Sequence, residues 1–528
     1  MSKITKLIAL MLAVIFALSL VACGGDSNVE SNDPTTTVSG DEQPQETVST
    51  KKGETTTTTK AKDNNKKTTK TTKKKIEAGV DNRASSTGAL IERTTNKAGN
   101  ASAKFVKSLN GFTLKILYPW ENIYGEKRCQ QAAMAAIAAV ENEFGVKIDE
   151  EGAFNRYNEN LASELSAKKC ENHIYYAQGG FFPSYFEKRY IADLTMPMRE
   201  AGVDFNDPWY ISNAKGFLNI DGKQYGWAAY EDEYAMPFHI IYNSKLLKSK
   251  RLKDPAELAK QGKWTWDVLL DYSKKFKDDK NITGFGTCSP ILLLEAMCEQ
   301  YGTSLTKISR GAEPKSNITD SKVKAALTTL GEWTTGKTPL CDTFQGKVWT
   351  YPKTQLAEGK VAMYFGSHDD IQNLKGSAAQ DDINIVPFPR RKGSKTYTGI
   401  ASPGFVAFIP SVHQSKAAKI LFIRNEYYRH NYRYVDRNFE YKWQTYFGDN
   451  KEAINNAAKI KFAKDGNKIR FCWTLLCESP DAGITTNTVI SEVISGKSTA
   501  AQAINSKKNA LTKTYSTVWS GHEITGNV

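Results

Sequence analysis

The 528-residue chain lacks the motifs of many metal-dependent and serine-dependent enzymes. It has only six histidines, none of them in an H-E-x-x-H pair, and it has no G-x-S-x-G motif. Cysteines at zinc-site spacing are also missing. The sequence therefore predicts no metal site, no cofactor and no catalytic residue.

Long uncharged runs are missing too, except at the N-terminus. The segment "LIALMLAVIFALSL" follows Lys3 and Lys6, a pattern that predicts an export signal over residues 1–22. Leu20-Val21-Ala22-Cys23 resembles the bacterial lipoprotein box, in which the signal is cut before the cysteine and that cysteine carries lipid. We expect a lipid anchor at Cys23. The alternative is an ordinary secretory signal that happens to meet a cysteine.

Residues 24–100 lack the periodic apolar face of a packed element, and Thr, Lys, Asn, Ser and Gly dominate them. This composition predicts a disordered, lipid-anchored tether over 23–103. Ten lysines stand in 51–75 against Glu54 and Asp63, so the net charge of +14 is partly a property of the tether. Together with export, this argues against nucleic-acid binding. The tether is expected to be a solvated spacer; the alternative is a basic sleeve attracted to anionic wall polymer or to the membrane surface.

The remaining part of the chain, about 425 residues, is long enough for two or more lobes with their own cores. Alternating residues predict a strand at 112–118, an Ala-rich stretch predicts a helix at 126–145, and "VKIDEE" predicts a second strand. Gly145 suits the left-handed end of that helix. The apolar residues at helical spacing are Met134, Ile137, Val140 and Phe144. A strand, a helix and a strand in succession indicate a parallel βαβ unit.

A series of short motifs follows in a fixed order along residues 111–515. They are Asp193-Leu194-Thr195, Asp221–Gly226, Ile241-Tyr242-Asn243, Trp264–Asp267, Gly359–Met363, Val386–Pro389 and "SGKSTAAQAI". With the lipobox, this series resembles the family 1 extracellular solute-binding proteins of bacteria, the maltodextrin-binding-protein-like receptors of ABC importers for sugars and oligosaccharides.

The resemblance implies an α/β protein with the two-lobe periplasmic-binding-protein type II fold, in which a ligand cleft lies between the lobes and closes by hinge rotation. The expected first lobe is 104–230 with about 400–470, and the expected second lobe is about 231–399 with 471–528. Crossings between the lobes are expected near 228–236, 397–405 and 471–479.

Aromatic and polar side chains after predicted strands are the candidate ligand contacts, because strand-exit loops gather such contacts in α/β lobes. In the first lobe they are Trp120, Glu121, Tyr176, Gln178, Phe181 and Phe182. From the crossings and the opposite lobe they are Tyr230, Glu231, Asp232, His368 and Trp473. His368 stands where the family pattern often has a ligand-stacking Trp. For each aromatic residue, a place in the core is the alternative.

Other motifs favour structural interpretations. Trp264 and Trp266 are expected to be core residues beside a helix that Thr265 can cap. Ser367-His368-Asp369 spells a triad, but neighbouring side chains point apart and cannot converge as a triad must. With Cys23 lipidated, seven cysteines remain, an odd number; Cys288/Cys298 or Cys472/Cys477 could form a bridge, or all could be free thiols.

The sequence therefore predicts a lipid-anchored, monomeric, non-enzymatic receptor. It is expected on the outer face of the cytoplasmic membrane, exposed to the extracellular side in a Gram-positive type of cell, where it captures a sugar or oligosaccharide and delivers it to ABC permease subunits. One alternative is a surface carbohydrate-degrading enzyme, with carboxylates of Glu231-Asp232-Glu233 as acid and base. Another is an adhesin that binds wall polymer without transport.

Overall fold

The computed structural model describes the part of the chain that contains the predicted lobes. The described residues are 91–95, 101–105, 109, 111–121, 123–124, 127–153, 155–229, 235–336, 339–348, 350–461, 468–479, 481 and 483–527. They fall in one of the two units into which the chain divides, Asn82–Val528. The predicted signal sequence and Cys23 lie outside the described residues. Among the described helices, none combines the length and the apolar character that a bilayer crossing requires.

One short strand lies within residues 23–103, which composition predicts to be a disordered tether, and a second begins there and ends at Phe105. Strand β1 (Ile91–Thr95) pairs antiparallel with β2 (Ala101–Phe105). Residues 91–95 and 101–103 of the predicted tether therefore have strand structure. Ile91 and the two threonines of β1 are β-branched and favour an extended backbone, a local preference that the polar composition of the whole stretch conceals.

The first of the two large sheets has four strands, in the order β15-β5-β3-β4. Strand β3 (Thr113–Tyr118) is parallel to β4 (Lys147–Gly152) and β5 (Ile174–Gln178), and β15 (Phe405–Phe408) is antiparallel to β5. Helix α2 (Lys127–Phe144) connects β3 to β4, and Gly145 follows it with φ 63°. The predicted βαβ unit is confirmed, although Met134 lies on the exposed side of α2.

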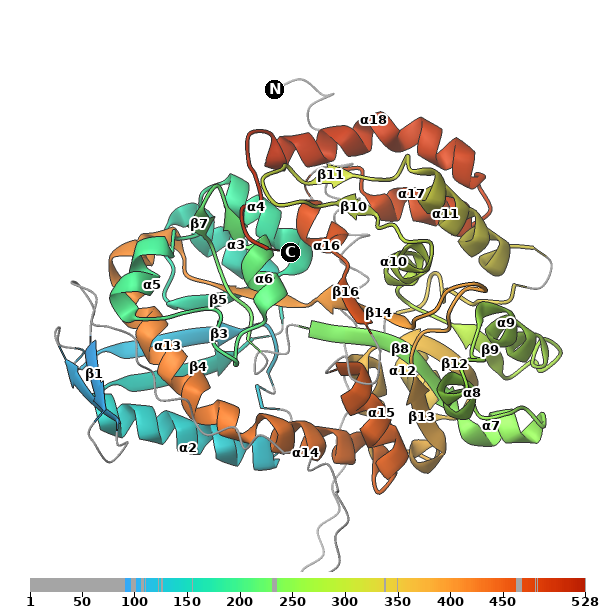
Figure 1. Cartoon of the computed structure of the whole chain (residues 1–528), viewed down its shortest axis with the longest axis horizontal. Helices are drawn as coiled ribbons and strands as arrows, with labels where there is room; N and C mark the ends of the chain where they lie inside the picture. The colour runs from blue at the N-terminus through green and yellow to red at the C-terminus, as the bar shows by residue number, and fades with distance from the viewer. Residues whose placement is uncertain are drawn as a thin grey trace, which may run out of the picture. The chain divides into compact units, whose positions relative to one another are not determined.

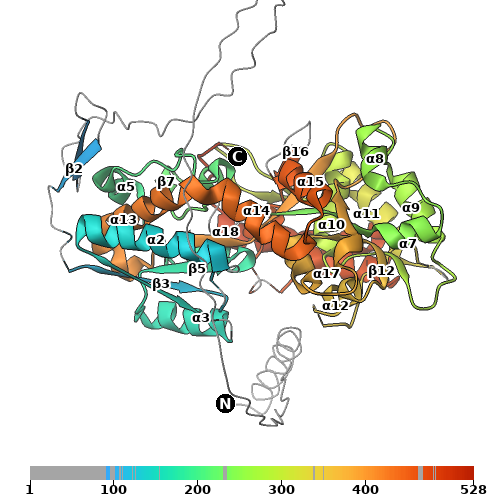
Figure 2. The ribbon, with the colours of Figure 1, turned by 90° about the horizontal axis from the view of Figure 1, so that it is seen from below.

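Helices cover both faces of this sheet. On one face α2, α5 (Thr195–Ala201) and α13 (Ala417–Asn431) share a core with the side chains of Ile116 and Tyr176. On the other face α3 (Tyr157–Ala167), α4 (Phe182–Glu187) and α6 (Ser212–Phe217) pack on Tyr175 and Ala177. Figure 2 shows α2 and α13 on one side of β3 and β5, with α3 on the other.

A second, six-stranded sheet is built around the nine-residue strand β8 (Ala235–Asn243). Its order is β16 (Lys468–Phe471), β14 (Thr398–Pro403), β8, β12 (Val361–Gly366) and β9 (Thr283–Gly286), and β13 (Ile383–Val386) also pairs with β8. Strands β12, β13 and β14 are antiparallel to β8, whereas β9 is parallel to β12 and β16 to β14.

Two cores flank the second sheet. The larger core is formed with α7 (Ser244–Ser249), α8 (Pro255–Lys260), α9 (Trp266–Lys274), α10 (Pro290–Gln300), α11 (Ser321–Thr334), α17 (Thr486–Ile494) and α18 (Ala500–Trp519). The smaller core is formed with α12 (Tyr351–Ala357), α14 (Val435–Phe447) and α15 (Lys451–Lys461). The minor elements are the hairpins β6 (Asn219–Ile220) with β7 (Lys223–Gln224) and β10 (Thr306–Lys307) with β11 (Lys315–Ser316), the short helix α16 (Thr474–Cys477), and the 3-10 turns η1 (Gly179–Phe181), η2 (His368–Leu374), η3 (Gln380–Asp382), η4 (Ser411–Lys416) and η5 (Tyr432–Tyr434).

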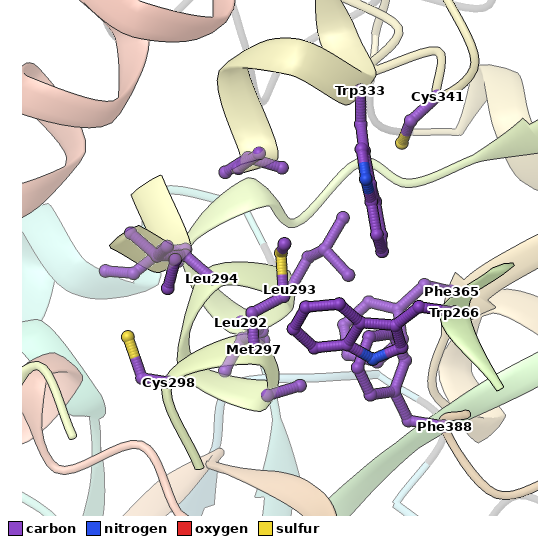
Figure 3. Close-up of a cluster of buried hydrophobic side chains, with 14 of the residues drawn as sticks. Trp266, Leu292, Leu293, Leu294, Met297, Cys298, Trp333, Cys341, Phe365 and Phe388 are labelled. Atoms are coloured by element: carbon purple, nitrogen blue, oxygen red, sulfur yellow. The ribbon is translucent and has the colours of Figure 1, made fainter. Parts of the chain in front are cut away.

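The tryptophans of the "WTWD" motif belong to the larger core. Trp266 packs edge-on against Trp333 and lies over Phe388, as Figure 3 shows. The indole N–H groups of Trp264 and Trp266 donate to the carbonyls of Pro387 (2.9 Å) and Pro389 (2.8 Å). The structural interpretation of both tryptophans is confirmed. Thr265 occupies the N-cap position of α9, but its side chain makes no capping hydrogen bond.

The chain passes from one sheet to the other at Gly404, which separates β14 from β15. Helix α14 packs against both α2 and η2, so it also connects the two halves (Figure 1). Helix α15 and strand β16 lie within the stretch 400–470 predicted for the first lobe, yet both pack with the second sheet.

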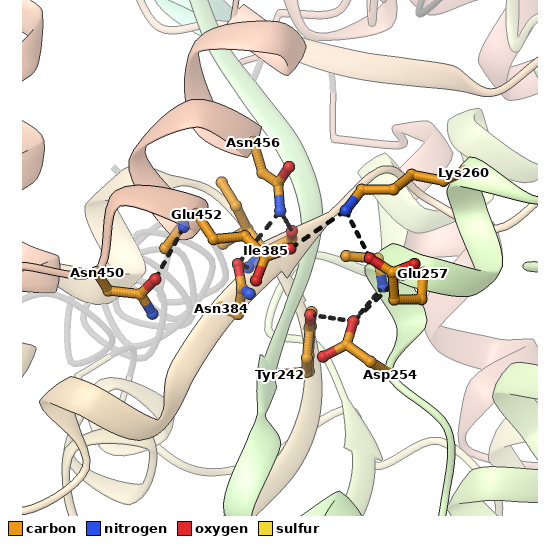
Figure 4. Close-up of polar contacts among 11 residues, drawn as sticks. Tyr242, Asp254, Glu257, Lys260, Asn384, Ile385, Asn450, Glu452 and Asn456 are labelled. Carbon is orange, nitrogen blue, oxygen red and sulfur yellow. Dashed lines mark hydrogen bonds and ion pairs between the residues drawn. The ribbon is translucent and has the colours of Figure 1, made fainter.

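Polar contacts hold α15 against the second sheet. The side-chain amides of Asn450 and Asn456 donate to the carbonyls of Ile383 (3.1 Å) and Ile385 (3.2 Å) in β13. Lys260 in α8 lies 3.5 Å from a carboxylate oxygen of Glu452 (Figure 4).

Candidate functional site

The aromatic side chains at the exits of β3 and β5 form one cluster. Trp120 is half-buried two residues after β3, and its ring lies 5.5 Å from that of Tyr118 and 5.9 Å from that of Tyr176. Phe405, also half-buried, meets Trp120 edge-on at 5.0 Å. Because Phe405 pairs with Gln178 at the end of β5, the cluster lies directly beside the crossing at Gly404. We call Trp120 and Phe405 the aromatic shelf.

Gly152, the last residue of β4, permits a close approach of the loop that carries Trp120. A Cβ atom at residue 152 would lie 2.3 Å from the carbonyl oxygen of Trp120 and 2.9 Å from the Cα of Glu121. Such distances are impossible without movement of the backbone, so any larger residue would displace the loop.

Three predicted residues have accessible side chains beside these strand exits. Glu121 is exposed next to Trp120. Gln178 is exposed at the end of β5, where its Oε1 accepts a hydrogen bond from Asn158 (3.3 Å). Phe181 is half-buried in η1 and stacks on Tyr185 at 6.1 Å. Charged, amide and aromatic groups are thus available at the strand exits of the first sheet.

Two other predicted residues are core residues in this structure. Tyr176 and Phe182 each have 0% exposed surface. Tyr176 stacks on Tyr118 under Trp120, whereas Phe182 packs on Phe217 on the opposite face of the sheet. Trp473 is half-buried and stacks on the same Phe217 at 5.0 Å, with 8° between the rings. The core alternative therefore holds for Tyr176 and Phe182.

The remaining predicted residues lie outside what the structure describes. Tyr230, Glu231 and Asp232 are in the undescribed stretch 230–234. The backbone of His368 is described, and it begins η2 directly after the exit of β12, but its side chain is not described. Their roles as ligand contacts stay predictions.

A polar cluster occupies the exits of β9 and β12, which are parallel neighbours. The hydroxyl of Tyr364 donates to the thiol sulfur of Cys288 (2.8 Å), and the carboxylate of Asp370 accepts from the backbone N–H of Ser367 (2.8 Å). Gly366 lets this cluster close up, because a Cβ there would lie 2.4 Å from the ring of Tyr364 and 2.6 Å from a carboxylate oxygen of Asp370. The cluster therefore packs closely around Gly366, two residues before His368.

Burial controls the charges of this polar cluster. It raises the pKa of Asp370 to about 6, although the Ser367 N–H and the Lys353 ammonium oppose the shift. Burial also raises the pKa of the Cys288 thiol, which keeps it protonated at neutral pH. Asp369 keeps 40% of its side chain exposed, and Lys353 lies 2.6 Å from one of its oxygens. Asp369 is thus an accessible carboxylate that is paired with the buried ammonium of Lys353.

Phe405, Cys288, Asp369 and Asp370 lie in these two clusters but are not among the predicted ligand contacts. Phe405 carries a usable signal, because it follows a glycine at a predicted crossing. Asp369 and Asp370 carry the same strand-exit signal as His368, which they follow directly. Cys288 carries none, since only the parallel pairing of β9 with β12 brings it to the exit of β12. The thiols of Cys288, Cys298, Cys472 and Cys477 are not bridged, so neither considered disulfide is present.

No group of three or more His, Cys, Asp or Glu side chains within the described ranges could hold a metal ion. A separate cavity of about 450 Å³ opens beside β9, between the end of α9 and residues 339–345. None of the predicted site residues lines it.

The family comparison identifies the class of protein. Residues 133–424, more than half of the chain, match the family described as "Bacterial extracellular solute-binding protein". The chain belongs to this family. The predicted membership is confirmed, and the family consists of binding proteins rather than enzymes. No curated protein sequence matches the chain.

Solved structures of similar fold include transport receptors. A solute-binding protein of an ABC transporter from Thermotoga lettingae TMO, bound with α-D-tagatose, has a TM-score of 0.55 and 17% identity, over 77% of this chain and 100% of that chain. The substrate-binding protein from Listeria monocytogenes in complex with cycloalternan has a TM-score of 0.52 and 17% identity, over 77% and 99%. The GacH receptor of Streptomyces glaucescens, studied unliganded and with acarbose, has a TM-score of 0.54 and 15% identity, over 77% and 100%.

These similarities show the fold. The solute-binding protein described here has the α/β, two-lobe architecture of the periplasmic binding proteins. Its two large sheets match the two lobes expected for this class of protein, in which ligands bind in the cleft between the lobes.

Proposed function

We propose that this solute-binding protein captures a sugar or oligosaccharide for an ABC importer. The observation that carries the proposal is the aromatic shelf of Trp120 and Phe405, which stands at the strand exits beside the crossing at Gly404. Structures of the same fold are complexes with tagatose, cycloalternan and maltotetraose, which supports a carbohydrate ligand here.

The chemistry of the two strand-exit clusters suits a carbohydrate. Aromatic faces cover the C–H faces of sugar rings, and Trp120 offers such a face on a rigid support. Carboxylates accept hydrogen bonds from pairs of sugar hydroxyls, and side-chain amides both accept and donate them. Glu121 and Asp369 provide the carboxylates, and Gln178 provides the amide. In this proposal Glu231, Asp232 and His368 add further polar groups from the crossing and the second lobe.

Closure of the lobes would couple binding to transport. A ligand that contacts both lobes stabilises the closed arrangement by the difference between its affinities for the closed and open forms. Permease subunits then recognise the closed form. The chain needs no catalytic group for this role and is proposed to act as a monomer.

The location completes the proposal. The family is extracellular, and the Leu20–Cys23 lipobox supports a lipid anchor on the outer face of the cytoplasmic membrane, as in a Gram-positive type of cell. The lysine-rich stretch 51–75 then lies between the anchor and the binding protein.

A ligand screen tests the proposal. Full-length protein in detergent is melted with maltotetraose, cycloalternan, D-tagatose, amino acids or peptides. A ligand present at about 100 times its dissociation constant should add about 2.7 kcal/mol to the free energy of unfolding. The proposal predicts that a carbohydrate gives this shift and is recovered intact. Stabilisation by amino acids or peptides alone would refute it, and release of reducing ends would indicate an enzyme.

A further inference from the structure

A buried arginine lies beneath the two tyrosines that support Trp120. Arg424 in α13 is 1% exposed, and its Nη1 lies 3.0 Å from Oε1 of Glu150 in β4, whose side chain is 3% exposed. Burial of an ion pair costs desolvation free energy that only good geometry and further hydrogen bonds offset. A buried pair is therefore weak evidence for stability and points to another use.

The further hydrogen bonds lead to the aromatic cluster. Nη2 of Arg424 donates to the hydroxyls of Tyr118 (2.5 Å) and Tyr176 (3.0 Å). The Tyr118 hydroxyl in turn donates to Oε1 of Glu150 (2.8 Å), and that of Tyr124 donates to Oε2. One guanidinium thus ties together the last residue of β3 and residues from the middle of β5 and of β4.

Two more rings fix the guanidinium itself. Its carbon lies 4.5 Å from the ring centroids of both Tyr427 and Tyr428, one turn further along α13. Arginine presents its donors in a rigid planar fork, so its direction determines where both tyrosine hydroxyls lie. The rings of Tyr118 and Tyr176 stack at 4.8 Å, and the Trp120 ring packs against both of them.

We propose that Arg424 is a positioning residue that holds Trp120 in one orientation at the strand exit, by fixing the hydroxyls of Tyr118 and Tyr176. Arg424 is enclosed in the protein, so in this proposal it acts on the ligand surface through these two rings and not by contact. The effect on affinity rests on the proposed sugar site, whereas the effect on the Trp120 orientation does not. The two can therefore be measured separately.

Fluorine NMR of full-length protein in detergent, labelled with 5-fluorotryptophan, tests the orientation. The Trp120 resonance is assigned with Trp120→Phe. In Arg424→Lys a single ammonium replaces the fork, and in Tyr176→Phe the ring stays but the acceptor is lost. Both variants should broaden or split the Trp120 resonance and leave the resonance of Trp333, in the other half of the molecule, unchanged.

Tyr175→Phe is the matched control. Tyr175 precedes Tyr176 in β5, is equally buried, and faces the opposite side of the sheet, where its hydroxyl donates to Glu164. This variant removes a buried phenolic hydroxyl and should lower the melting temperature without altering the Trp120 resonance. A general loss of stability would instead change the Trp120 resonance in all three variants.

Maltotetraose and D-tagatose serve as probes of affinity. With whichever of them binds, Arg424→Lys and Tyr176→Phe should raise Kd by roughly three- to tenfold, and Tyr175→Phe should not. A Trp120 resonance identical to wild type in folded Tyr176→Phe and Arg424→Lys overturns the inference; if the lysine variant does not fold, Tyr176→Phe decides. If neither sugar moves the wild-type Trp120 resonance while the variants broaden it, the positioning role stands and the sugar site at Trp120 falls.

Discussion

Glu295 should make the stability of this protein depend on pH in the opposite sense from most carboxylates. It lies in α10 with 1% of its surface exposed, and one oxygen accepts a hydrogen bond from the backbone N–H of Leu305 (2.9 Å). Burial, together with the nearby charge of Glu299, raises its pKa to about 8, against 4.5 for a free glutamate. The folded protein therefore keeps this carboxyl protonated at neutral pH.

The sign and size of the effect follow from proton linkage. Between about pH 4.5 and 8 the folded state holds a proton that the unfolded chain releases, so the free energy of unfolding falls as pH rises through this window. The interval of about 3.5 pH units, at about 1.36 kcal/mol per unit, amounts to up to about 5 kcal/mol. The contribution of Glu295 is fully present below pH 4.5 and lost above pH 8.

Glu295→Gln should remove this dependence. The glutamine oxygen can still accept from Leu305, and the side chain stays neutral at every pH. Its extra buried N–H groups cost about 1–3 kcal/mol where they find no partner. The variant should therefore be about 2–4 kcal/mol more stable than wild type above pH 8 and equal or less stable at pH 5.

Urea unfolding followed by circular dichroism, from pH 5 to 9, measures this difference. Burial also raises the pKa of Glu478, to about 7, but Glu478 is present in both proteins and cancels in the comparison. Glu332 in α11 is exposed, so Glu332→Gln is the control and should not change the dependence of the unfolding free energy on pH. Parallel wild-type and Glu295→Gln profiles would show that the carboxyl is ionised in the folded protein, and would refute the reasoning.

Three further predictions concern the shelf and the anchor. Trp120→Ala should weaken sugar binding by about 1–3 kcal/mol, roughly 5- to 150-fold, in calorimetry; a folded variant with unaltered affinity would remove Trp120 from the site. Gly152→Ala should shift the Trp120 fluorescence and cost about 1–3 kcal/mol in stability, because its Cβ would collide with the Trp120 carbonyl; an unchanged spectrum would contradict this. Cys23→Ser should release the protein from the membrane fraction or leave it unprocessed with unchanged affinity, and membrane retention with normal processing would count against a lipid anchor.

Elements with strong local periodicity could be predicted from the sequence. The strand, helix and strand from 112 to 151 formed as expected, because alternation and helical spacing of apolar residues report directly on burial. The tryptophans of "WTWD" were predicted to be structural for a different local reason, the helix start that Thr265 and Asp267 indicate beside them. The hairpin of β1 and β2 was missed, since two five-residue strands in a polar stretch have little apolar patterning.

The site was only partly predictable. Strand exits were recognised, but Tyr175, Tyr176 and Ala177 in β5 are all buried, because helices cover both faces of the sheet and alternation no longer separates core from ligand side. Cys288 and Asp370 come together only through the pairing of strands far apart in the chain. Likewise Arg424 reaches Glu150 across 274 positions, a contact that no local pattern indicates.

The aromatic cluster at Trp120 and the polar cluster at Asp370 are built in the same way, which bears on the choice of ligand. Each places a buried carboxylate, Glu150 or Asp370, under a tyrosine, and each has a glycine where a Cβ would collide with the cluster. Under the proposed lobe closure, surfaces supported by buried hydrogen bonds in this way should keep their shape. Ligand choice should then depend on the accessible groups on top, such as Trp120 and Asp369, so substitutions there should alter specificity at small cost in stability, whereas substitutions of the buried carboxylates should cost stability first.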